Sequence, residues 1–109
     1  MSDFSPQQLA ILQRLIANEF TLVAFPLYAN AVGVRKGSCA ALLDPIANGG
    51  FHVFGEPGVL IEGNLTVRIT EKEKTWFVWK KQRLEATLER VLELECFVAE
   101  LKLLLEPVT

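Results

Sequence analysis

The segment from residue 71 to residue 83 is the part of the sequence whose side chains are best suited to bind a ligand. Its aromatic and basic candidates are Trp76, Trp79, Lys80, Lys81 and Arg83. Aromatic rings beside cations can stack on nucleobases and neutralise phosphates, which is the chemistry of a nucleic-acid or nucleotide-binding module. Alternation along a strand, however, sets Trp76 and Trp79 on opposite faces, and at least one of these faces must turn toward the core. The pattern therefore favours a buried aromatic strand over a binding surface.

The charge of the whole chain also argues against a nucleic-acid-binding surface. Its 109 residues include 11 Lys and Arg against 13 Asp and Glu, for a formal net charge of −2. Nucleic-acid-binding domains carry a basic excess, and anionic surfaces attract proteins of positive charge. The longest uncharged stretch, residues 20–34, is too short and too broken to span a bilayer. We therefore expect neither nucleic acid nor a membrane as the partner.

Histidine and cysteine, which often mark catalytic or metal sites, are few and scattered. His52 is the only histidine, and Cys39 and Cys96 are the only cysteines. They form no CxxC or CxxH pair, so no zinc site is expected. No base or helix N-terminus adjoins Cys39 to activate its thiol. The sequence thus predicts no catalytic residue, no metal, no cofactor and no structural disulfide, and two unpaired thiols indicate a cytoplasmic location.

The elements that position these residues begin with a helix from Pro6 to about Glu19. Ser5 and Gln8 have the spacing of a capping box, and Pro6 occupies the first helical position, where no amide hydrogen is needed. Farther along, two apolar runs flank a polar turn that contains Gly37, a pattern that predicts a β-hairpin over residues 32–43.

More strands are expected in the middle of the chain. Residues 51–54 predict a short strand that ends at a loop over residues 55–58, which is rich in Gly and Pro. The apolar pattern of residues 59–69 surrounds Gly63-Asn64, which is either a hairpin turn or a bulge in one long strand. The β-branched and aromatic content of residues 75–80 predicts the last strand.

A second helix is expected from just after Arg83 to about Glu106, where Pro107 stops it. One broad apolar face gathers Leu88, Val91, Leu92, Leu94, Val98, Leu101 and Leu105. Phe97 and Leu104 fall near the acidic side of the helix instead. We therefore predict a homodimer with these two residues in its interface, since a monomer would leave both in water. The alternative is a helix packed between the sheet and the first helix, which would bury both within one chain.

Together these elements predict a single α+β domain over residues 1–109, with an N-terminal helix, an antiparallel sheet of four to six strands and a long C-terminal helix packed on the sheet. In size and order of elements the chain resembles the dimeric chaperones of bacterial secretion systems, although it lacks the extra mid-sheet helix that these usually carry. We expect a small cytosolic, non-enzymatic protein that acts as a homodimeric protein-interaction or chaperone-like module. The alternative is a nucleic-acid or nucleotide-binding module that uses the segment 75–83.

Overall fold

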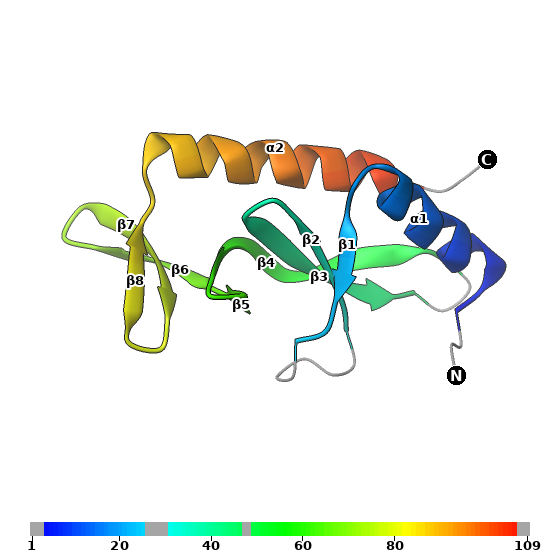
Figure 1. The fold of residues 1–109 in the computed structure, drawn as a ribbon, viewed down its shortest axis with the longest axis horizontal. Helices are drawn as coiled ribbons and strands as arrows, with labels where there is room; N and C mark the ends of the chain where they lie inside the picture. Colours follow the sequence, from blue (N-terminus) through cyan, green and yellow to red (C-terminus); the bar gives the residue numbers. More distant parts are fainter. Residues whose placement is uncertain (1–3, 26–30, 47–48, 107–109) are drawn as a thin grey trace.

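Helix α1 (Pro6–Ala17) opens the computed structural model, which describes residues 4–25, 31–46 and 49–106 (Figure 1). The predicted capping box is confirmed. Ser5 Oγ accepts a hydrogen bond from the Gln8 backbone N–H at 3.1 Å, and the Gln8 side-chain oxygen accepts one from the Ser5 backbone N–H at 2.9 Å. The Gln8 side-chain amide also donates to the carbonyl oxygens of Ile46 and Gly50. The start of α1 is thereby tied to a distant loop.

Strands occupy most of residues 18–87. Those that the structure describes are β1 (Thr21–Val23), β2 (Val32–Lys36), β3 (Cys39–Pro45), β4 (Phe51–Ile61), β5 (Asn64–Leu65), β6 (Val67–Glu71), β7 (Lys74–Trp79) and β8 (Gln82–Glu85). The first five form one antiparallel sheet in sequence order, and β6, β7 and β8 form a second antiparallel sheet. The predicted α+β class and antiparallel pairing are confirmed, with a second, smaller sheet added to the one expected.

The β2–β3 hairpin has the predicted position, with Lys36 paired to Cys39 across the turn. The alternatives at Gly63-Asn64 resolve in favour of a hairpin turn, centred one residue earlier. Ile61 pairs with Asn64, so Glu62 and Gly63 form the turn, and their φ angles of 50° and 80° lie in the left-handed region. Adjacent residues with positive φ are typical of the type I′ turn, whose twist matches that of a hairpin.

The prediction that β4 ends at residues 55–58 is wrong, because one strand runs from Phe51 to Ile61. The pairing with β3 shifts within this segment: Leu42 faces Phe54, whereas Ala40 faces Gly58. Between these two pairs one residue of β3 is thus matched by three residues of β4, which makes an irregular bulge. A bulge leaves residues outside the ladder, so it tolerates a proline that a regular central strand would exclude.

The predicted start of the second helix, just after Arg83, is also wrong. Gln82–Glu85 is strand β8, and α2 (Leu88–Leu104) begins at the N-cap Thr87, whose side chain accepts a hydrogen bond from the Arg90 N–H at 3.3 Å. A turn at Lys80 and Lys81 folds β8 back onto β7. The residues of β8 favour helices individually, but strand pairing overrides that weak local preference.

Both helices pack on the five-stranded sheet, and Figure 1 shows α2 extended along one edge of the molecule. The largest fully buried side chains are Phe77, Ile11, Leu15, Leu43, Leu94, Leu101, Val34 and Cys39. They come from α1, α2, β2, β3 and β7. A single core therefore joins both helices, the larger sheet and two strands of the smaller sheet, β7 and β8.

Candidate interaction surface

Helix α2 carries apolar side chains on two opposite faces. Its inner face consists of Leu94, Phe97 and Leu101, all of them buried in the core. Its outer face carries Leu88, Leu92 and Leu103, whose exposed fractions are 75%, 49% and 65%. A surface helix of a monomeric protein is normally polar on the side turned to water. The outer face of α2 is therefore the surface that packing within one chain leaves unexplained.

The prediction that Phe97 and Leu104 point away from the core is wrong. Phe97 is only 5% exposed, and its ring centre lies 5.6 Å from that of Phe20. Leu104 is half-buried against the same core. Helix α2 packs against both the sheet and α1, as in the alternative to the predicted dimer interface. Neither Phe97 nor Leu104 is therefore free to meet a partner. The helix is rotated relative to the predicted orientation, and Leu88 and Leu92, expected inside, are on the outside.

The outer stripe of α2 is a continuous line of residues. Its members are Leu88, Leu92, Cys96, Ala99 and Leu103, all of them exposed. At 100° per residue they lie within about 80° of one another, and the line is about 22 Å long. Glu89, Glu93 and Glu95 are exposed beside it. The helical spacing of these residues can be read from the sequence. The sequence alone does not show that they are exposed, because the inner face of α2 is equally apolar.

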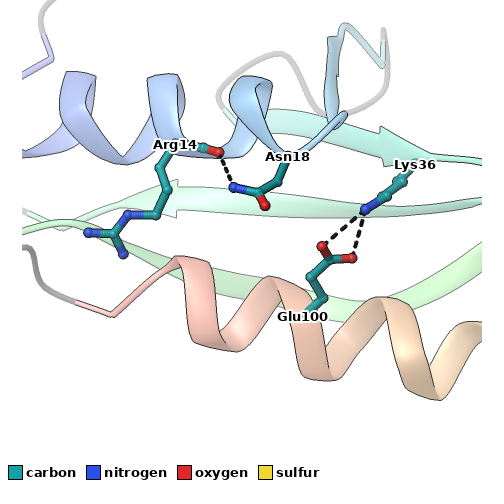
Figure 2. A network of polar contacts seen from close by, with 4 residues as sticks. All are labelled: Arg14, Asn18, Lys36 and Glu100. Carbon is teal, nitrogen blue, oxygen red and sulfur yellow. Dashed lines mark hydrogen bonds and ion pairs between the residues drawn. The ribbon is translucent and has the colours of Figure 1, made fainter.

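Two polar contacts fix the orientation of α2, so the outer stripe belongs to a firmly held helix. Lys36 of β2 lies 2.9 Å from the Glu100 carboxylate (Figure 2), and both side chains are about one-third exposed. Arg14 of α1 donates from Nη1 to the carbonyl oxygens of Leu104 and Glu106, both at 3.2 Å. These are carbonyl groups that the end of a helix cannot satisfy by itself. A rotation of α2 would break both contacts.

A hollow of about 440 Å³ opens beside the outer stripe. Its apolar lining comes from Leu94, Val98 and Ala99 of α2 and from Pro57 of the β4 bulge. Charged groups also line it, including an ion pair of 3.7 Å between Arg68 and Glu56. Ala99 belongs to both the stripe and the hollow, so the two features form one apolar surface.

The five residues of the aromatic and basic segment do not assemble into one site. Trp76 pairs with Ile69 across the sheet and lies under the Arg83 guanidinium, 5.9 Å from the ring centre. Arg83 also contacts the Glu71 carboxylate at 3.1 Å. Strand alternation turns Trp79 to the other face of β7, the same face as buried Phe77. Trp79 lies under the Lys80 ammonium, 5.3 Å from the ring centre, while Lys80 and Lys81 form the exposed turn.

The histidine and the two cysteines lie apart as well. His52 faces Asp44 across the β3–β4 pair, with 3.7 Å between Nε2 and the carboxylate, and both side chains are about half exposed. Cys39 is fully buried, and burial, with a smaller contribution from the charge of Glu93, raises the pKa of its thiol to about 11. Both cysteines are free. Within the described ranges, no group of three His, Cys, Asp or Glu residues is arranged to hold a metal ion.

Comparisons with protein-family models, curated proteins and solved structures find no match to this chain. The resemblance to secretion chaperones therefore rests on size and element order alone. No described helix has the length and apolar character needed to cross a membrane. The most unusual part of the surface is the outer stripe of α2.

Proposed function

We propose that this chain is a cytoplasmic, non-enzymatic protein-interaction or chaperone-like module that works as a homodimer through the outer stripe of α2. The observation that carries the proposal is the exposure of three leucines on one line of a firmly held helix. Burying a fully exposed leucine contributes about 1.5–3 kcal/mol, so these three partly exposed leucines together offer about 3–6 kcal/mol toward association. Single exposed leucines are common, but three in a line form a patch of the kind that marks interaction sites.

A second copy of the chain is the partner that the stripe itself favours. A two-fold dimer needs a surface that is complementary to itself. The stripe has a leucine at each end, Leu88 and Leu103, and it can therefore overlap its own copy along its full length. Free thiols at Cys39 and Cys96 support the cytoplasmic assignment, because reducing compartments keep thiols unpaired.

Sedimentation equilibrium at micromolar concentrations tests the proposal. The wild-type protein is expected to be a dimer, and Leu92→Glu to be a monomer with an unchanged far-UV circular dichroism spectrum, because a carboxylate would be buried without a partner. The matched control is Ile16→Glu, which alters a side chain of similar exposure (54%) on α1. A monomeric wild type, or a dimer that tolerates Leu92→Glu as well as it tolerates Ile16→Glu, would contradict the proposal.

A further inference from the structure

We infer that the two copies pair α2 against α2 in antiparallel orientation, with the two-fold axis at the level of Glu95 and Cys96. This inference rests on the homodimer proposed above and specifies which residues meet. In Figure 1, none of the described helices and strands lies beyond α2 on its side of the molecule, so a second helix can approach it there.

The length of the stripe determines the level of the axis. The midpoint between Leu88 and Leu103 falls between Glu95 and Cys96. With the axis at this level, Leu88 of one copy meets Leu103 of the other at both ends of the interface. A shift by one helical turn in either direction leaves a terminal leucine of each copy in water, which forfeits part of the apolar burial.

The sizes of the side chains favour the antiparallel orientation over the parallel one. Antiparallel pairing brings Leu92 to the level of Ala99 of the second copy, so a large residue faces a small one. The hollow beside Ala99, lined by Val98, Leu94 and Pro57, gives the incoming leucine an apolar place to pack. Parallel pairing would set Ala99 of one copy against Ala99 of the other, so no large side chain would fill the hollow.

The helix dipole of α2 also favours the antiparallel orientation. Antiparallel pairing brings opposite ends of the two helix dipoles together, whereas parallel pairing brings like ends together. Glu89 in the first turn and Lys102 in the last turn lie on opposite sides of the stripe, so they do not meet across the pair.

Disulfide trapping tests the orientation. In a Cys96→Ser background, one protein carries Leu88→Cys and a second carries Leu103→Cys, both at exposed positions that can change without disturbing the core. Cys39 is fully buried and stays unreactive. In the antiparallel dimer, positions 88 of the two copies lie about 22 Å apart along the helices. A disulfide requires Cα atoms within about 7 Å, so they cannot join.

The inference predicts that mild oxidation of the mixed proteins gives a disulfide-linked dimer of position 88 with position 103, in at least tenfold excess over either protein oxidised alone. Rapid cross-linking of each protein to itself would overturn the antiparallel orientation and leave the homodimer in place. Sedimentation as a dimer without any cross-link would place the interface elsewhere and overturn the inference. A protein that is monomeric at all concentrations would overturn both this inference and the proposed function.

Discussion

Replacing Phe97 with alanine probes the packing of α2 on the core. The ring is almost fully buried and packs against Phe20 with a centroid distance of 5.6 Å. Truncating a buried phenylalanine to alanine costs about 3–5 kcal/mol, through lost burial and the cavity that remains. Alanine is the better helix former by about 0.5 kcal/mol, which offsets a small part. We expect Phe97→Ala to lower the free energy of unfolding by about 3–4 kcal/mol.

Urea denaturation followed by tryptophan fluorescence measures this loss. With a slope of about 1–3 kcal/mol per molar urea, the midpoint should fall by about 1–4 M. Ile16→Ala serves as the control, because that side chain is half exposed on the other helix, and it should cost less than about 1 kcal/mol. Equal small losses for the two variants would refute the assignment of Phe97 to the inner face of α2.

Three further outcomes are expected. Ser5→Ala should cost about 0.5–2 kcal/mol of stability in the same urea assay, because the first turn of α1 loses its capping acceptor; an unchanged midpoint would show that the cap contributes nothing. Iodoacetamide at pH 8 should modify Cys39 only after unfolding, because burial keeps the Cys39 thiol protonated, with its pKa at about 11; mass spectrometry that finds Cys39 modified in the native protein would contradict this. Fluorescence anisotropy with a single-stranded oligonucleotide should show no binding tighter than about micromolar at physiological salt; tight, salt-sensitive binding would instead favour the nucleic-acid alternative.

Local signals in the sequence were enough to predict the elements that depend on neighbouring residues. The capping box of Ser5 and Gln8 specifies where α1 begins, and the polar turn at Gly37 specifies the β2–β3 hairpin. In both places the interacting groups lie within a few residues of each other. The α+β class follows from the order of such elements, and that prediction is confirmed.

Features that depend on distant contacts could not be predicted in the same way. The two faces of α2 are similarly apolar, so periodicity alone does not say which one turns inward; the contact of Phe97 with Phe20 decides it. Gln82–Glu85 has the composition of a helix and becomes a strand because β7 is there to pair with it. The candidate site was missed for the same reason, since the outer stripe of α2 is recognisable only once the inner face is known.

The order of elements in the chain has a consequence for how the protein is made. Helix α2 follows all the described strands in sequence, yet it supplies Leu94, Phe97 and Leu101 to a core shared with α1. A chain emerging from the ribosome produces α1 and the strands first, and neighbouring antiparallel strands can pair as they appear. The part of the larger sheet that α2 covers nevertheless stays open to water until α2 is synthesised. A nascent chain stalled before Thr87 would therefore expose part of the apolar face of the larger sheet, a surface that is prone to aggregation.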